Sequence, residues 1–198
     1  MKKYSVILAD PPWSYRDIGM DWAAKEGTKY RRSVMNHYGV MTIEDICALP
    51  IQDFMEENCA LFLWTTWPHI FFAQDVMNAW GFRYRSLAWV WAKLNKSSMG
   101  FHYGMGWYMR GNSEPCLLAI KGSMPPAVRD VQSLIVSSIR EHSRKPDEQY
   151  GKIERLYPDA PKLELFARRP WDGWDAWGNE VDSAIELEAT NSNDVDLW

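Results

Sequence analysis

The sequence predicts an α/β protein whose central, mostly parallel sheet carries helices on both faces. Expected strands alternate with expected helices along the chain, which is the order that produces such a sheet. Most of these strands are continuous apolar runs rather than alternating patterns, so both of their faces should be buried. A chain of 198 residues is long enough to bury a substantial core and short enough to form a single domain.

The N-terminal part begins with a strand and continues into a long polar loop. Residues Tyr4–Ala9 form the apolar run YSVILA, which is typical of a buried strand. The loop that follows is long for a compact domain and is therefore a candidate binding loop. After it, Thr42 with Asp45 three residues later has the pattern of a helix N-cap, and it predicts a short helix that ends before Pro50.

The middle of the chain predicts a strand, a helix and a second strand. The run ALFLWTT, Ala60–Thr66, is typical of a buried strand. Residues Pro68–Trp80 suit a helix, because proline stands at the first turn and Gly81 follows as a C-cap. Residues Phe82–Lys93 alternate between apolar and polar side chains and predict another strand.

The remaining elements follow a glycine-marked loop. We expect a strand, a weaker strand, a helix and a final strand at Cys116–Gly122, Ser133–Ile139, Asp147–Tyr157 and Lys162–Ala167. Beyond them the chain is rich in aromatic residues and glycine. We therefore expect one domain over residues 1–182 and an acidic, flexible tail over residues 183–198.

Cysteine usage and the N-terminus indicate the cellular setting. Cys47, Cys59 and Cys116 are isolated, odd in number and far from histidine, which argues against a disulfide framework and against a zinc site. We assign no metal. The first residues lead into an apolar run too short for a signal peptide or a membrane span, so we expect a cytoplasmic protein that does not contact a membrane.

Charge is unevenly distributed although the net charge is only −4. Residues 170–198 contain 8 acidic and no basic residues, which leaves 18 acidic against 22 basic residues, or +4, in residues 1–169. A mildly basic body suits a phosphate-bearing substrate, whereas the acidic tail could serve only solubility. The basic residues that we assign to phosphates are Lys25, Lys29, Arg31, Arg32, Lys93, Lys96 and Arg110, and for each the alternative is a solvated loop.

The most informative short pattern is Asp10-Pro11-Pro12-Trp13, directly after the first strand. Ligands of such sheets bind beyond the carboxyl ends of the strands, so Asp10 and Arg168, which each follow a strand, should face one crevice. The prolines fix the backbone and remove two N–H groups, so the neighbouring carbonyls should point in fixed directions without competing local donors. A carboxylate and a carbonyl held side by side match an NH₂ group.

Two interpretations of this turn remain open. In the first, it is a rigid turn with a buried indole. Alternatively, the two acceptors grip an aromatic amine while Trp13 stacks on its ring. Pulling both amine hydrogens toward acceptors localises the nitrogen lone pair, and this gain arises mainly in the transition state of attack on a sulfonium methyl group.

Further stretches turn this pattern into a resemblance. NHYGVMTIEDI, ALFLWTT, RGNSEPCLLAIKG, HSRKPDEQYGKIERLYP, KLELFARR and WDAWGNE follow in order, over roughly residues 4–182. The chain thereby resembles the MT-A-seventy family of S-adenosylmethionine-dependent adenine-N6 methyltransferases. The resemblance implies a Rossmann-like class I methyltransferase fold, S-adenosyl-L-methionine as cofactor and a nucleic acid as substrate.

The resemblance also implies residue roles. Its catalytic residues are Asp10, Pro11, Pro12 and Trp13. Its cofactor-binding residues are Asp10, Lys145, Glu164, Leu165, Phe166, Arg168, Asn179 and Glu180, with Lys145 at the methionine end, close to the catalytic acid, and Glu164 at the ribose. Its substrate-binding residues are Trp13, Tyr38, Arg110, Asn112 and Glu114, to which the basic loop residues Lys25, Lys29, Arg31 and Arg32 add phosphate contacts.

Some residues have a structural interpretation as well. Tyr150, Ile153 and Leu156 of the expected helix should lie in the core, whereas Glu164 inside an apolar strand needs a partner. The chain departs from the mRNA enzyme of the family at Arg169-Pro170-Trp171-Asp172, where that enzyme has a histidine–asparagine pair, and at Glu180, where it has glutamine. No G-x-G-x-x-G loop supports cofactor binding.

Three functions are consistent with these residues. The first is adenine-N6 methylation of DNA, because a compact chain without added RNA-binding modules is more similar to bacterial or phage DNA modifiers. The second is the same chemistry on RNA. The third is an inactive nucleic-acid-binding partner subunit, against which the intact Asp10 motif, Lys145 and Glu164 argue. For a short family member, a homodimer and a heterodimer with a partner subunit are both open alternatives.

Overall fold

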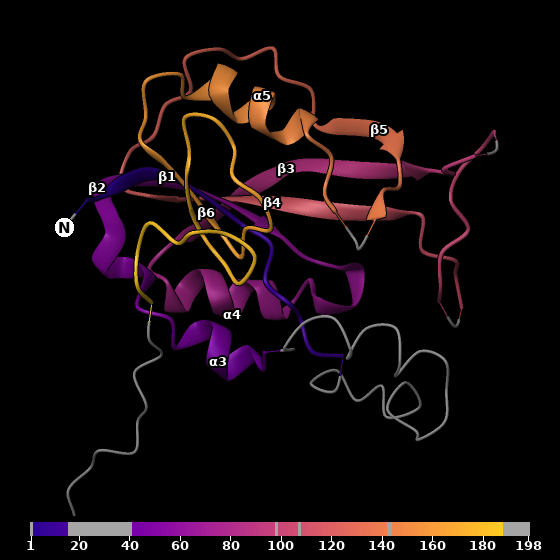
Figure 1. Cartoon of the computed structure of the whole chain (residues 1–198), viewed down its shortest axis with the longest axis horizontal. Helices are drawn as coiled ribbons and strands as arrows, with labels where there is room; N and C mark the ends of the chain where they lie inside the picture. Colours follow the sequence, from indigo (N-terminus) through magenta and orange to yellow (C-terminus); the bar gives the residue numbers. More distant parts are fainter. Residues whose placement is uncertain (1, 16–40, 98, 107, 142–143, 188–198) are drawn as a thin grey trace, which may run out of the picture.

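The computed structural model describes residues 2–15, 41–97, 99–106, 108–141 and 144–187. Within these residues seven strands form one sheet in the order β5-β3-β4-β2-β1-β6-β7. The strands are β1 (Tyr4–Ala9), β2 (Met55–Trp64), β3 (Arg83–Leu94), β4 (Ser113–Lys121), β5 (Leu134–Ser138), β6 (Lys162–Leu165) and β7 (Asp175–Trp177). The chain is therefore an α/β protein with β1 near the centre of its sheet (Figure 1).

The sheet is mostly parallel, as the sequence predicts. Strand β1 pairs in parallel with β2 and β6, β6 pairs in parallel with β7, and β3 pairs in parallel with β5. Only β4 runs against its neighbours β2 and β3 among the described strands. Consequently the start of β4, not its end, lies at the sheet edge where β1 and β2 end.

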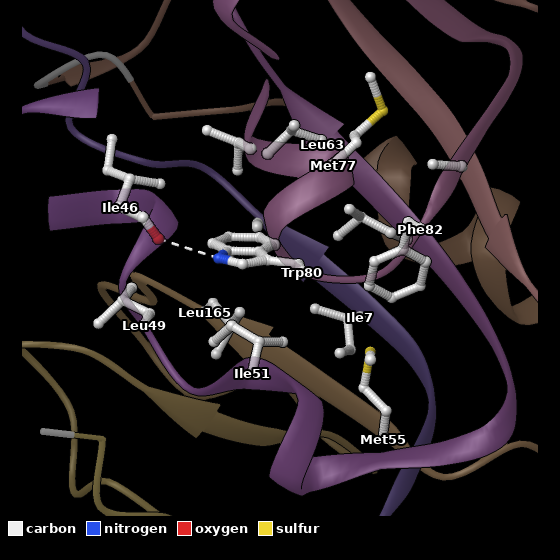
Figure 2. Packing of buried hydrophobic residues seen from close by; sticks show 14 of the residues in the cluster. Ile7, Ile46, Leu49, Ile51, Met55, Leu63, Met77, Trp80, Phe82 and Leu165 are labelled. Atoms are coloured by element: carbon white, nitrogen blue, oxygen red, sulfur yellow. Dashed lines mark hydrogen bonds between the residues drawn. The ribbon is translucent and has the colours of Figure 1, made fainter. Parts of the chain in front are cut away.

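One face of the sheet is covered by α3 (Ile43–Cys47) and α4 (Phe72–Ala79), which lie on the same side in Figure 1. Thr42 and Asp45 form the expected capping box at the start of α3. Between the helices lies the fully buried ring of Trp80, whose indole N–H donates to the Ile46 carbonyl at 2.9 Å (Figure 2). The 3₁₀ turn η1 (Ile51–Phe54) closes this core.

Helix α5 (Glu148–Leu156) covers the other face of the sheet (Figure 1). Its Tyr150 and Ile153 are buried against Phe62, Trp64 and Trp89 of the sheet. The Phe62 and Trp89 rings stack with centroids 5.3 Å apart, and such aromatic pairs add to the stability gained by burial. Helices therefore cover both faces of the sheet, as the alternating order of elements predicts.

Three elements begin three or more residues away from their expected starts. Strand β4 begins at Ser113 instead of Cys116. Strand β2 begins at Met55 instead of Ala60, because the exposed polar segment Glu56–Asn58 extends it through an irregularity in its pairing with β1. The expected helix at Pro68 divides into a 3₁₀ turn, η2 (Trp67–His69), and α4, which begins at Phe72. Gly81 follows α4 with a φ of 81°, so the expected glycine cap is confirmed.

The C-terminal segment adds a short strand that the sequence does not predict. Strand β7 lies within the aromatic and glycine-rich stretch and pairs with β6. After it, the Ala184 N–H donates to the Ala176 carbonyl at 2.8 Å, and Ile185 is buried against the core. These first residues of the predicted tail thus pack on the domain, while residues 188–198 lie outside the described chain. The domain boundary at 182 stays a prediction.

No helix in the described parts of the chain has the length and apolar character needed to cross a membrane.

Candidate active site

Asp10 lies at the carboxyl edge of the sheet, in the position that the sequence predicts. Strand β1 pairs Ala9 with Leu63 of β2 and with Leu165 of β6. The next residue, Asp10, therefore stands between the ends of two neighbouring parallel strands. Its side chain is about a quarter exposed, so the carboxylate borders a cavity and is neither buried in the core nor fully solvated.

The two prolines after Asp10 form a tight turn, but their carbonyls are not free of local donors. The Trp13 N–H donates to the Pro11 carbonyl at 2.9 Å, and the Met41 N–H donates to the Pro12 carbonyl at 3.2 Å. The expectation of no competing donors is wrong, because the first N–H after the prolines turns back onto Pro11. A carbonyl oxygen has a second lone pair, so Pro11 can still accept another hydrogen.

The indole of Trp13 belongs to the core. It is 7% exposed, and its N–H donates to the Trp64 carbonyl at 3.0 Å. Its ring centroid lies 5.6 Å from that of His69. For Trp13 the structure therefore agrees with the first interpretation of the motif, a rigid turn with a buried indole. The side chain anchors this turn to the end of β2. A base-flanking role for Trp13 stays a prediction.

Lys145 is buried between two carboxylates. Its Nζ lies 2.8 Å from both oxygens of Asp10 and 3.5 Å from Glu114, and it stands 5.4 Å from the ring centre of Trp64. Burial by itself would lower the pKa of Lys145, but Asp10 and Glu114 outweigh burial, and the pKa is raised. Lys145 is therefore an ammonium that holds Asp10 in place.

Glu114 links Lys145 to a second lysine. Lys93 Nζ lies 2.8 Å from its carboxylate, whose side chain is 12% exposed. Burial favours the neutral acid, yet Lys145 and Lys93 outweigh it and hold the pKa of Glu114 below its usual range. The antiparallel direction of β4 places Glu114 here, because the beginning of that strand meets the end of β2.

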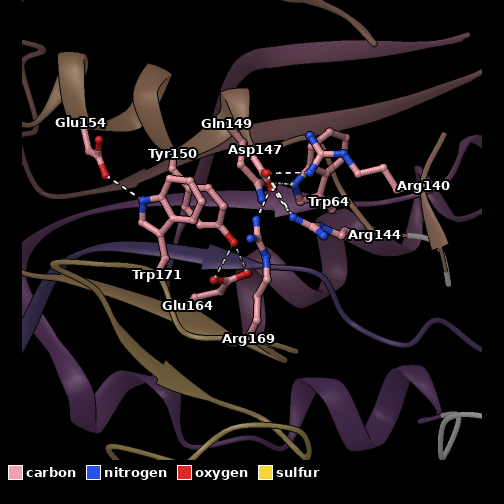
Figure 3. Close-up of polar contacts among 10 residues, drawn as sticks. All are labelled: Trp64, Arg140, Arg144, Asp147, Gln149, Tyr150, Glu154, Glu164, Arg169 and Trp171. Atoms are coloured by element: carbon pink, nitrogen blue, oxygen red, sulfur yellow. Dashed lines mark hydrogen bonds and ion pairs between the residues drawn. The ribbon is translucent and has the colours of Figure 1, made fainter. Parts of the chain in front are cut away.

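Glu164 also lies at this edge, on β6. The Tyr150 hydroxyl donates to both of its oxygens, at 2.9 and 3.1 Å (Figure 3). Burial raises the pKa of Glu164 to about 7, against the effect of this hydrogen bond. Burial and the Glu164 charge raise the pKa of Tyr150, so its hydroxyl remains a donor. Tyr150 is a core residue, as expected, and also the partner that Glu164 needs.

An arginine cluster surrounds Asp147 at the start of α5 (Figure 3). Arg140 donates to Asp147 at 2.6 Å, Arg144 at 3.1 Å, and Arg169 also pairs with it. The Arg169 guanidinium additionally lies 5.1 Å from the ring centre of Trp171. Sequence reasoning missed this cluster. Its sequence signals are the three-residue spacing between Arg144 and Asp147 and the departure at Arg169, which provides a further arginine that reaches Asp147.

A pocket of about 220 Å³ brings most of the predicted cofactor residues together. The residues that the sequence predicts to bind the cofactor and that line this pocket are Asp10, Lys145, Glu164, Phe166, Arg168 and Glu180. Asp10 and Arg168 thus face one crevice, as expected. Leu165 is instead fully buried in the core, and Asn179 is not among the lining residues. Phe166 has a φ of 61°, a strained backbone for a non-glycine residue at a point where the chain leaves the sheet.

A larger cleft of about 1030 Å³ lies on the other side of Glu114. Arg110, Asn112 and Glu114, which were predicted to contact substrate, all line it, together with Lys93 and Trp67. Glu114 contacts Lys145 of the first pocket, so the two cavities share a wall of paired charges. The arrangement has one cavity on each side of a fixed ammonium–carboxylate chain.

The remaining predicted substrate residues are Lys25, Lys29, Arg31, Arg32 and Tyr38, and all lie outside the described residues. Within the described residues, no group of three or more histidine, cysteine, aspartate or glutamate side chains could hold a metal ion.

Comparison with known proteins gives a consistent family. The family model described as MT-A70 matches residues 4–180. The Type II methyltransferase M.MunI of Mycoplasma sp is 32% identical over 197 residues, covering 94% of this chain and 82% of that protein. The human N(6)-adenosine-methyltransferase catalytic subunit METTL3 is 32% identical over 190 residues, covering 94% of this chain. An MT-A70-like N(6)-adenosine-methyltransferase of Arabidopsis thaliana is 32% identical over 182 residues, covering 90% of it.

The length of the match differs between these relatives. The chain spans 30% of the human protein and 24% of the Arabidopsis protein, whereas it spans most of M.MunI. The family model matches the residues of all seven described strands, from β1 to β7. The α/β sheet described above is accordingly a Rossmann-like methyltransferase fold, in a family whose members act on nucleic acid. The chain belongs to the MT-A70 family of N6-adenosine methyltransferases.

Proposed function

We propose that this chain is an S-adenosylmethionine-dependent methyltransferase of the exocyclic N6 amine of adenine in DNA. One observation carries the proposal: the Asp10 carboxylate stands at the carboxyl edge of the sheet, fixed by Lys145, with a cavity on each side of the charged chain. We assign the smaller pocket to the cofactor and the larger cleft to the nucleic acid.

The residues of the smaller pocket fit the cofactor chemically. Glu164 at a strand end offers a carboxylate for two ribose hydroxyls, and Arg168 and Lys145 offer cations toward the methionine carboxylate. Asp10 places negative charge where a sulfonium group would bind. S-adenosylmethionine supplies an electrophilic methyl group when it is bound.

The chain's own residues then act on the amine. Asp10 accepts one amine hydrogen, and the free lone pair of the Pro11 carbonyl accepts the other. The nitrogen would become positive as its bond to the methyl carbon forms and the bond from that carbon to sulfur breaks, leaving a neutral thioether, so both acceptors would stabilise the transition state more than the bound substrate. Lys145 keeps the carboxylate oriented toward the amine, and one amine proton leaves by way of Asp10. An inactive partner subunit would have no need of this arrangement.

The DNA assignment is supported by the match along most of M.MunI, named a Type II methyltransferase, compared with a quarter to a third of the adenosine methyltransferases. We expect labelled methyl transfer from S-adenosylmethionine to DNA to exceed transfer to an RNA of the same sequence by at least about tenfold. Duplex DNA, single-stranded DNA and RNA should be compared at equal adenine content and low salt, because phosphate contacts weaken with salt. Preferential methylation of RNA would overturn the DNA assignment and leave the chemistry standing.

Cofactor affinity should depend on pH through Glu164. Its pKa of about 7 means that it holds a proton at pH 6 and is a carboxylate at pH 8. Only the carboxylate accepts hydrogen bonds from both ribose hydroxyls, so affinity should rise with pH, by up to about tenfold between pH 6 and 8. Charged and titratable neighbours are Asp10, Arg169 and Asp147, with Tyr150 as the hydrogen-bond donor.

Calorimetric titration of S-adenosylmethionine from pH 5.5 to 8.5 measures this dependence. Glu164→Gln should bind more weakly at pH 8 and lose the inflection near pH 7. Tyr150→Phe should move the inflection to higher pH, because the hydrogen bond from Tyr150 lowers the pKa of Glu164. A Glu164→Gln profile that keeps the wild-type inflection would show that another group, such as the cofactor's amine, causes it.

A further inference from the structure

Trp67 presents an exposed aromatic ring inside the larger cleft. It is 48% exposed, although most other indoles of the described chain are largely buried. Its N–H donates to the Ser113 hydroxyl at 3.0 Å, and Ser113 begins β4 beside Glu114. One edge of the ring is therefore anchored while about half of its surface remains accessible. Burial of a hydrophobic core does not explain a tryptophan in this state.

The turn that carries Trp67 is fixed relative to the Asp10 turn. Pro68 follows Trp67 in η2 and restricts the backbone there. The buried ring of His69 donates from Nε2 to the Ser14 carbonyl at 2.9 Å, and its Nδ1 accepts from the Thr66 hydroxyl at 2.7 Å. The segments that follow β1 and β2 are thus joined by one histidine, which links the turn that carries Trp67 to the segment that follows Asp10.

The surroundings of Trp67 suit a nucleic-acid strand. Arg110 and Lys93 line the same cleft as cations, and Asn112 lines it as an amide. Glu114 joins the cleft to Lys145 and hence to Asp10. Tyr15, which follows the Asp10 turn in the chain, also lines this cleft, so a strand held in the cleft would lie next to the segment that carries Asp10.

We propose that Trp67 is a stacking platform for the nucleobase next to the target adenine. This inference rests on the proposed function and names how the acceptor strand is held. An adenine that leaves a duplex, or that is presented by a single strand, loses stacking with its neighbour, and an exposed indole can replace that contact. Such stacking tolerates any base, because every base has an aromatic face. Trp67 is a positioning residue, since it touches the substrate strand and not the reacting amine.

The test is a double-mutant cycle in which one change is a substitution at Trp67 and the other is the removal of a base from the DNA. Wild-type protein, Trp67→Ala and Trp67→Phe are each titrated with a fluorescent single-stranded oligodeoxynucleotide that contains one adenine. S-adenosylhomocysteine is present in each titration. A second set of oligonucleotides carries an abasic site on the 5′ or the 3′ side of that adenine. We expect Trp67→Ala to weaken binding of the intact strand by about tenfold, and Trp67→Phe to restore most of it. With one of the two abasic strands, all three proteins should bind equally.

Kinetics add a readout that a merely structural role would not give. Trp67→Ala should raise KM for the oligonucleotide about tenfold, while kcat and the affinity for S-adenosylmethionine stay within about twofold of wild type. Equal binding by Trp67→Ala and wild type, or an undiminished effect of Trp67→Ala on both abasic strands, would overturn the proposal. A fall in kcat with unchanged binding would also overturn it.

The two proposals fail in different ways. In one case, Trp67→Ala binds the strand more weakly than wild-type protein, as expected, but wild-type protein methylates no adenine. This result would refute the proposed function and leave the stacking platform intact. In the other case, wild-type protein methylates adenine, but wild-type protein and Trp67→Ala bind the strand equally. This result would refute only the stacking role of Trp67.

Discussion

Asp10→Asn is expected to lower turnover of adenine methylation by about 10²- to 10³-fold, with the fold intact. Asparagine keeps the size of the side chain but loses the charge that stabilises the developing positive nitrogen, and losses of this size follow removal of one such electrostatic contact. Affinity for the target strand should change less than turnover, because the interaction strengthens in the transition state. Single-turnover assays with labelled S-adenosylmethionine measure the effect separately from product release.

The matched control for Asp10 is Asp130→Asn. Asp130 is an exposed acid that pairs with Arg155, away from the residues of both cavities, and its loss should leave turnover within about twofold. Thermal unfolding of both variants checks that each is folded. Turnover of Asp10→Asn within tenfold of wild type, in folded protein, would remove Asp10 from the chemistry.

Lys145→Met is expected to abolish measurable turnover and also to destabilise the fold. Lys145 is 8% exposed and pairs with Asp10 and Glu114, so methionine would leave two carboxylates close together without a cation. Removing one partner of a buried ion pair costs about 3 kcal/mol or more, which corresponds to a fall in Tm of about 6–12 °C for a domain of this size. Calorimetry and chemical denaturation measure both quantities.

Two further variants separate stability from chemistry at Lys145. Lys145→Met combined with Glu114→Gln should recover part of the lost stability, because the second change removes one unpaired charge. Activity should not recover, because Asp10 still lacks the ammonium that orients it. Recovery of activity in the double variant would show that Lys145 serves only to neutralise Glu114.

The predictable parts of the fold are those with strong local signals. Strand β1 has six residues, of which all but Ser5 are buried and hydrophobic, and it was predicted to the residue; the Thr42–Asp45 capping box fixed the start of α3. Helix α5 lies within one residue of the expected range at each end. In each case the local preference of the chain and its tertiary environment favour the same structure.

The remaining boundaries depend on contacts that a local pattern does not contain. The polar start of β2 is a strand only because β1 lies beside it. The turn η2 replaces the first turn of an expected helix because buried His69 bonds to Thr66 and to distant Ser14. Strand β7 has three residues and is held by pairing with β6. Three residues are too few to show the alternating pattern by which a strand is recognised in a sequence.

The site shows the same division between local and distant information. Asp10 and Arg168 could be placed at one sheet edge because each follows an expected strand. The 2.8 Å contact between Lys145 and Asp10 crosses 135 positions of sequence and was expected only from the family resemblance. The cluster around Asp147 joins Arg169 to the segment 140–147, and the indole N–H of Trp13 donates to the carbonyl of Trp64, 51 positions away. No spacing rule reveals such contacts.

The identity of the methylated atom tests the central claim most directly. Wild-type protein and Asp10→Asn are incubated with S-adenosylmethionine carrying a labelled methyl group and with DNA that contains all four bases, and the nucleosides are then separated by mass. The account predicts labelled N6-methyladenine from wild-type protein and almost none from Asp10→Asn, at equal cofactor occupancy. Label on another base or another atom, or equal N6-methyladenine from both proteins, would contradict it.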